Sequence, residues 1–147
     1  MHQKVLLKWI WIIYLFVMAW LLFGGRLASP HPFGACNPIP FSTISSQLSL
    51  LDQGLAHRRF ALVNLVGNVV MFVPAGYLVP QLFPRFQRFL PFLGLFLLCI
   101  CGVEVVQFVT GLGTLDVDDV ILNLVGVLAG YLLFRCHKKF ITKEKTK

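Results

Sequence analysis

The residues of this chain best suited to chemistry are four carboxylates close together in the sequence. Glu104 precedes an acidic string made of Asp116, Asp118 and Asp119. Carboxylates grouped in this way can hold a divalent cation, act as general acid or base, or accept hydrogen bonds from a bound ligand. Because Asp-x-Asp-Asp alone is a weak metal signal, the surrounding residues have to decide between these chemistries.

Amide side chains accompany the acids at helical spacing. Asn64 and Asn68 are one turn apart, and Gln107 follows Glu104 by three residues, so each pair shares a helix face. Asn123 follows the acidic string, and the group forms the polar part of the sequence.

One stripe connects the acidic string to small residues. Positions 116, 119, 123, 126 and 130 recur at helical spacing, which predicts that Asp116 and Asp119 face the other helices. Asp118 lies off this stripe and is expected to face headgroups or water. The pair Gly126 and Gly130 predicts close approach of another helix.

The elements that carry these residues are membrane helices. Of 147 residues, 57% are hydrophobic and 13% charged, against about 45–50% and 25% in soluble domains, which excludes a soluble domain and a disordered chain. Four apolar stretches, at about 5–23, 60–79, 90–110 and 117–134, each approach the ~20 residues that cross a bilayer. We therefore predict an all-α membrane protein, a four-transmembrane-helix bundle forming a single domain over 1–147, with a basic cytoplasmic tail at 135–147.

Basic residues predict the orientation. Ten of the 13 lysines and arginines fall on the side that both termini share: Lys4, Lys8, Arg85, Arg88, Arg135, Lys138, Lys139, Lys143, Lys145 and Lys147. The other side holds Arg26, Arg58 and Arg59. The positive-inside rule predicts a multi-pass protein of the cytoplasmic membrane with both termini in the cytoplasm. The lipid bilayer is its first partner, and no reading surface for nucleic acid accompanies the charge.

The outer loop, Gly24 to Arg59, divides into two parts. Its first half contains Pro30, Pro32, Pro38 and Pro40, which predicts an extended strap. Its second half places Ile44, Leu48, Leu51 and Leu55 on one helical stripe, which predicts a short amphipathic helix. This helix either lies in the outer membrane interface or covers the bundle by ordinary packing.

The distance of each polar residue from the outer end of its predicted helix places these residues in the outer half of the membrane. A carboxylate such as Glu104 is costly in lipid unless it is paired, so we expect Arg58 or Arg59 to pair with Glu104 or Asp119. The cluster either locks the helices together or forms a ligand site that opens outward. The candidate site residues are Arg58, Arg59, Asn64, Asn68, Glu104, Gln107, Asp116, Asp119 and Asn123.

Three strings resemble the VanZ-like family of bacterial membrane proteins, named for a member associated with teicoplanin resistance. They are Asn37-Pro-Ile-Pro-Phe41, the string from Asn64 to Gly76 (N-x-x-G-N-x-x-x-F-x-P-x-G), and Glu104-x-x-Gln107 followed by Asp116-x-Asp-Asp-x-x-x-Asn-x-x-Gly126. The resemblance extends from about Asn37 to Tyr131. Many relatives have an arginine shortly before the acidic string, whereas this chain reads Thr110-Gly-Leu-Gly-Thr-Leu115.

The resemblance implies a role in glycopeptide resistance, and three hypotheses follow. We favour a protein without catalytic residues, metal or cofactor, whose outward polar cluster binds a glycopeptide antibiotic, a lipid-linked cell-wall precursor or a partner protein. The alternative is an intramembrane enzyme acting on a lipid-linked substrate, with the three aspartates holding a cation and Glu104 or His57 as acid or base. A third hypothesis is a structural subunit that forms oligomers through Gly126 and Gly130.

Overall fold

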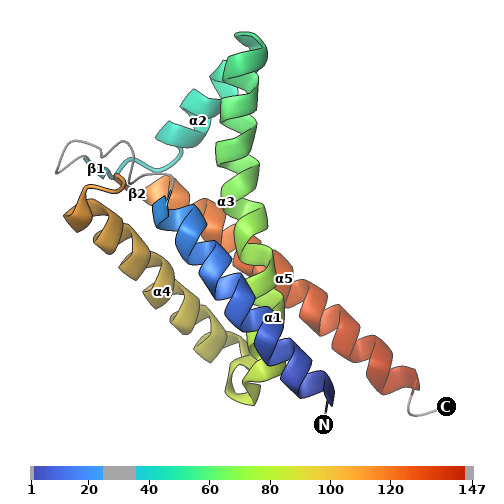
Figure 1. Cartoon of the computed structure of the whole chain (residues 1–147). Helices are drawn as coiled ribbons and strands as arrows, with labels where there is room; N and C mark the ends of the chain where they lie inside the picture. Colours follow the sequence, from blue (N-terminus) through green and yellow to red (C-terminus); the bar gives the residue numbers. More distant parts are fainter. Residues whose placement is uncertain (1, 25–35, 145–147) are drawn as a thin grey trace.

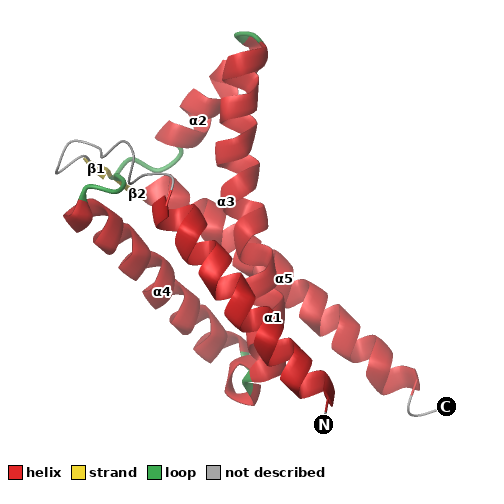
Figure 2. Ribbon diagram, viewed as in Figure 1, coloured by secondary structure: helices red, strands yellow, loops and turns green. Residues whose placement is uncertain are grey.

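The chain is a bundle of long helices with one short strand pair (Figure 2). The computed structural model describes residues 2–24 and 36–144. Four helices in this part are long and apolar enough to cross a membrane. They are α1 (His2–Ala19, extended by the π-helical turn η1, Trp20–Gly24), α3 (Leu55–Leu82), α4 (Phe89–Thr110) and α5 (Val117–Glu144). The predicted four-helix membrane protein is confirmed.

The helix ends differ most from the predicted spans at two places. Helix α3 begins at Leu55 rather than Phe60, because Gly54, with φ of 108°, is the residue that breaks the chain from the preceding turn. Helix α5 continues through the basic segment that follows Phe134, where lysine and arginine are good helix formers.

Helices α3 and α5 form the main packing pair of the bundle, because glycines let their backbones touch. A Cβ on Gly126 would lie 2.0 Å from the carbonyl oxygen of Val69, and one on Gly130 would lie 2.1 Å from that of Val73. Gly76 on α3 has the same relation to Val127 on α5, at 2.1 Å. The close helix approach predicted from Gly126 and Gly130 is confirmed.

The remaining helices pack on this pair from different sides. Helix α1 contacts α3, and α4 contacts α5 and the 3-10 turn η3 (Pro84–Gln87) that joins α3 to α4 (Figure 1). The rings of Phe92 on α4 and Tyr131 on α5 lie 4.3 Å apart between centroids in the core. The Tyr131 hydroxyl donates to the carbonyl of Gln87 and fixes η3 against α5.

The described part of the loop between α1 and α3 contains a strand, a helix and a turn. Strand β1 (Cys36–Asn37) pairs in parallel with β2 (Leu115–Asp116), and α2 (Ser42–Ser49) is followed by the 3-10 turn η2 (Leu50–Asp52). The predicted loop helix exists but is shorter than its stripe, since Leu55 already belongs to α3. The predicted residues Arg26, Pro30, Pro32, Lys145 and Lys147 lie outside the described residues.

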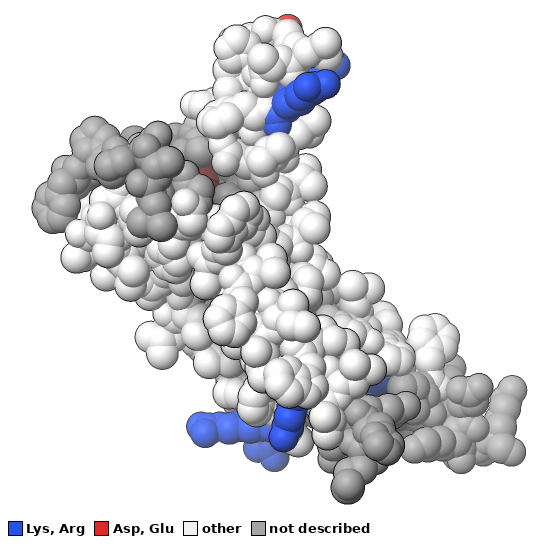
Figure 3. Space-filling view, in the orientation of Figure 1, with Lys and Arg blue, Asp and Glu red and all other residues white. Residues whose placement is uncertain are grey.

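The two ends of the molecule are chemically different. The strand pair lies at one end of the bundle and both termini at the other, while α2 and the first turns of α3 project beyond the strand end (Figure 1). In the view of Figure 3, lysines and arginines appear at the projecting tip and at the end with the termini, with an uncharged band between them. This distribution is typical of a protein embedded in a bilayer.

Candidate functional site

The strand pair brings the outer loop onto the start of α5. Asn37 lies opposite Asp116 in the register of β1 and β2. The Asn37 side-chain amide donates to the hydroxyls of Ser42 and Thr43, both at 2.7 Å, and its nitrogen lies 3.4 Å from each Asp116 carboxylate oxygen. The Thr43 hydroxyl donates to Asp116 Oδ2 at 2.6 Å. Side chains that lie 79 and 73 residues earlier in the sequence thus hold the buried carboxylate of Asp116.

Asp118 attaches helix α2 to the bundle. Its side chain is 0% exposed, and its carboxylate accepts the backbone N–H groups of Phe41 at 2.5 Å and Ile44 at 3.0 Å. The first N–H groups of a helix lack intrahelical partners, and α2 has no capping side chain of its own. Asp118 therefore supplies the N-cap of α2 from a different helix, where a negative charge also complements the helix dipole.

The expectation that Asp118 faces headgroups or water is wrong. The stripe was drawn as if residue 116 began the helix, but Leu115 and Asp116 form β2, and α5 begins at Val117. In the first turn of α5 the side chain of Asp118 contacts the loop that carries Phe41 and Ile44. Helical periodicity describes only which residues of α5 share a face, so it could not predict this contact. Its buried carboxylate is stable there because two N–H donors face it.

A chain of hydrogen bonds continues from Asp118 to α4. The backbone N–H of Asp118 donates to Asp116 Oδ1 at 2.9 Å, and the N–H of Asp116 donates to Glu104 Oε2 at 3.3 Å. Asp116 is 6% exposed and Glu104 is 4% exposed. We call this network the acidic junction; its members are Asn37, Phe41, Ser42, Thr43, Ile44, Glu104, Asp116 and Asp118.

Phe41 adopts a conformation that is uncommon for its type. Its φ and ψ angles are 65° and 4°, in the left-handed region, at the residue before α2. Such a backbone costs about 1–3 kcal/mol in a residue other than glycine. The hydrogen bond from its N–H to Asp118 holds this turn in place, so the acidic junction also fixes the direction in which α2 leaves the strap.

The other predicted polar residues surround the acidic junction. Asn68 on α3 donates to Asp119 Oδ1 on α5 at 2.7 Å. Gln107, 2% exposed, donates to the carbonyl of Leu22 at the end of the first span. Asn123 is 2% exposed, and its side-chain oxygen has no hydrogen-bond partner in the described part of the chain, while Asn64 is half-buried on α3.

The predicted basic partners lie elsewhere. Arg58 and Arg59 are exposed in the first turns of α3, and Arg58 Nε donates to the carbonyl of Leu51 at 2.8 Å. Because α3 starts earlier than predicted, these arginines project beyond the bundle instead of lying level with the buried Glu104. His57 is exposed in the same turn, with Nδ1 3.2 Å from the carbonyl of Gln53, and does not join the acidic junction.

The junction uses its carboxylates as hydrogen-bond acceptors. Among the residues whose side chains are described, no three His, Cys, Asp or Glu side chains are grouped to hold a metal ion. The oxygens of Asp116 and Asp118 instead face backbone N–H, hydroxyl and amide donors from the loop, together with the backbone N–H of Asp118. What this arrangement does best is to hold a loop and a helix rigidly over one end of the bundle.

Sequence reasoning missed the loop side of this network. Ser42, Thr43 and the backbone of Phe41 and Ile44 were not among the candidates, although hydroxyl residues at a helix start are a known capping signal. Asn37 was noticed within its proline string, but its partner Asp116 is 79 residues away. A long-range strand pair two residues long leaves no periodic pattern in a sequence.

The fold and the acidic junction define a class of protein. It is a multi-pass membrane protein with four spans, and buried acidic and amide side chains gather at the end of the bundle remote from its termini.

Comparison with known proteins identifies the family. The profile of the VanZ/LLP1 family matches residues 11–140, and the chain belongs to this family. Over 82 residues it is 32% identical to Protein VanZ of Enterococcus faecium, a match that covers 56% of this chain and 50% of that protein. The match thus spans about half the length of the curated relative. No solved structure matches the chain.

Proposed function

We propose that this protein acts in the bacterial cytoplasmic membrane as a non-catalytic binding protein that contributes to glycopeptide (teicoplanin) resistance. The observation that carries the proposal is the acidic junction, which brings together residues of the first and third strings that resemble the family, in one network at one end of the bundle. The network supports a surface made of β1, the turn at Phe41 and α2. This surface is where a glycopeptide or a lipid-linked cell-wall precursor would bind.

The orientation is part of the proposal. Ten of the 13 lysines and arginines belong to the end with the termini, the loop between α3 and α4, and the basic segment after Phe134. By the positive-inside rule this end is cytoplasmic, and the acidic junction then faces outside. Glycopeptides and wall precursors meet on that side of the membrane, which is consistent with a binding role there.

The contacts of the acids favour binding over catalysis. Asp118 is engaged with two backbone N–H groups, and Asp116 with a hydroxyl and a backbone N–H, so both are held in fixed geometry.

The test is antibiotic tolerance in a susceptible host. We expect the wild type to raise teicoplanin tolerance and Thr43→Val to lose most of the effect, because this change removes the hydroxyl that holds Asp116. Asp52→Asn, at an exposed acid of η2, is the matched control and should behave like the wild type. Membrane levels of all variants are measured by immunoblot.

Two outcomes would contradict the proposal. Full tolerance in Thr43→Val at equal membrane level would mean that the junction is not part of the activity. Tolerance that is abolished by a chelator, together with equal loss in Asp116→Asn, Asp118→Asn and Asp119→Asn, would favour the enzyme alternative, because three ligands of one cation should matter alike.

A further inference from the structure

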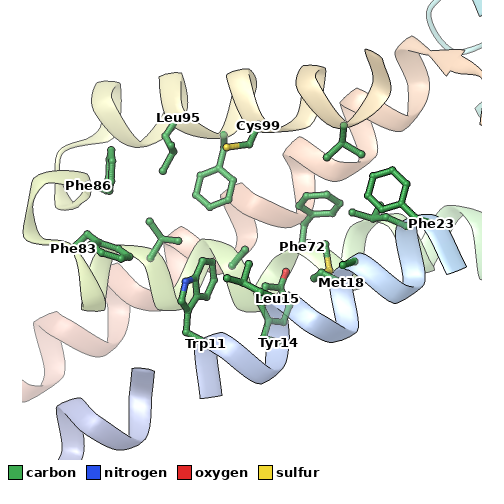
Figure 4. A pocket seen from close by; sticks show the side chains of 16 residues that line it. Trp11, Tyr14, Leu15, Met18, Phe23, Phe72, Phe83, Phe86, Leu95 and Cys99 are labelled. Atoms are coloured by element: carbon green, nitrogen blue, oxygen red, sulfur yellow. The ribbon is translucent and has the colours of Figure 1, made fainter. Parts of the chain in front are cut away.

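A second feature of the molecule is an apolar cavity between α1, α3 and α4 (Figure 4). Its volume is about 520 Å³, within the roughly 300–1,000 Å³ of small-molecule sites. Apolar and aromatic side chains line it, among them Trp11 and Leu15 from α1, Phe72 from α3, and Phe96 from α4. The Tyr14 hydroxyl, also at the cavity, already donates to the carbonyl of Met71.

The occupant of this cavity has to come from the bilayer. All three surrounding helices are membrane spans, and the outer faces of α1 and α4 are covered with exposed apolar residues such as Phe16 and Leu98. The helices around the cavity are therefore in contact with hydrocarbon, where water is scarce. A hydrocarbon chain from a lipid that fills the cavity gains dispersion contacts that an empty cavity lacks.

Basic residues adjoin one end of the cavity. Phe83 and Phe86 line the end near the termini, where Arg85 and Arg88 belong to the same exposed turn. Lys8 precedes Trp11 by one helical turn and is exposed at the same end. The opposite end is lined by Val103, which is followed directly by the buried acid Glu104.

From this charge pattern we propose that the cavity binds one anionic phospholipid. One acyl chain lies among the apolar side chains, and the phosphate lies at the basic end between Lys8, Arg85 and Arg88. The reverse direction would place the phosphate at the end lined by Val103, away from these three basic residues. The phosphate position lies at the end of the cavity remote from the acidic junction, and the proposal does not depend on the function proposed above.

Two neighbouring cysteines make the proposal testable. Cys99 lines the cavity, whereas Cys101, two residues further on α4, points about 200° away and is the matched control. Two single-cysteine proteins, one keeping Cys99 and one keeping Cys101, are purified in detergent and treated with N-ethylmaleimide. Added phosphatidylglycerol should slow the alkylation of Cys99 in a saturable way and leave that of Cys101 unchanged.

The charge is tested in the same assay. Arg85→Gln and Arg88→Gln should each raise the half-saturating concentration of phosphatidylglycerol roughly fivefold, as expected for a basic side chain near a lipid phosphate. Neither change should alter the weaker effect of phosphatidylcholine. Arg59→Gln, an exposed arginine at the other end of the molecule, should have no effect. Circular dichroism confirms that each variant is folded.

Three results would overturn the proposal. Equal slowing at Cys99 and Cys101 would mean general coverage by lipid and not a site. No difference between phosphatidylglycerol and phosphatidylcholine would remove the role of the basic end. Protection of Cys99 that rises with protein concentration and ignores lipid would assign the cavity to a second copy of the chain.

Discussion

At the scale of single residues, Asp118 is the most deeply buried aspartate of the acidic string. It is fully buried, and its two oxygens accept N–H groups at the start of α2. Removing the carboxylate leaves both donors without this acceptor, which costs about 1–3 kcal/mol for a buried group. We expect Asp118→Ala to lower the free energy of unfolding by that amount, and Asp118→Asn by less, because the amide oxygen still accepts one bond.

Thermal unfolding of the purified protein in detergent measures this effect. Asp52→Asn removes an exposed carboxylate ten residues after Ser42 and should leave the midpoint unchanged. Hydrogen exchange at the amides of Phe41 and Ile44 should accelerate in the Asp118 variants. If Asp118→Ala melts like the control and these amides stay protected, Asp118 does not cap α2.

Sequence reasoning at this scale was right about burial and wrong about one direction and one pairing. The energetic cost of placing polar side chains in lipid correctly indicated that Glu104, Asp116 and Asn123 are buried. It could not indicate which way Asp118 points, since its partners are backbone N–H groups of a distant loop. The expected pairing of Arg58 or Arg59 with a buried acid was wrong, because the position of these arginines along the bundle depends on where α3 begins.

At the scale of elements, the contact between α3 and α5 depends on three glycines. Any Cβ at Gly126 would lie 2.0 Å from the carbonyl oxygen of Val69, a distance that no side chain tolerates. Because that obstacle is backbone, the helices would have to separate. We expect Gly126→Ala to destabilise the protein by at least the ~1–3 kcal/mol of overpacked cores.

Gly102→Ala on α4 is the matched control, because an added Cβ there has nothing within 4 Å. Alanine also favours a helix over glycine by about 0.5–1 kcal/mol, so this variant should be as stable as the wild type or slightly more stable. Thermal midpoints of both variants in one detergent decide the matter. Equal midpoints would mean that the contact between α3 and α5 is looser than the structure has it.

The elements themselves were largely predictable. Runs of about 20 apolar residues indicate spans because a bilayer imposes that length, and the small residues at 126 and 130 indicate the packing face. The strand pair and the exact extent of α2 were not predictable. They depend on contacts between Asn37 and Asp116 that neither local propensity nor periodicity encodes.

At the scale of the whole molecule, the remaining question is which end faces outside. The molecule has an exposed cysteine near each end of the helix bundle. Cys36 lies in β1, at the end with the strand pair, and Cys136 lies in α5, at the end with the termini. The charge distribution predicts that Cys36 is outside and that Cys136 is in the cytoplasm. In intact cells, a charged thiol reagent that does not cross membranes should label Cys36 and leave Cys136 unlabelled.

The two cysteines control for each other when each is kept alone in a single-cysteine protein. After the cells are broken, the same reagent should label Cys136 as well, which shows that its thiol is reactive and was protected only by the membrane. Labelling of Cys136 in intact cells, with Cys36 protected until lysis, would reverse the orientation. The acidic junction would then face the cytoplasm, and a site that meets a glycopeptide outside the cell would no longer be tenable.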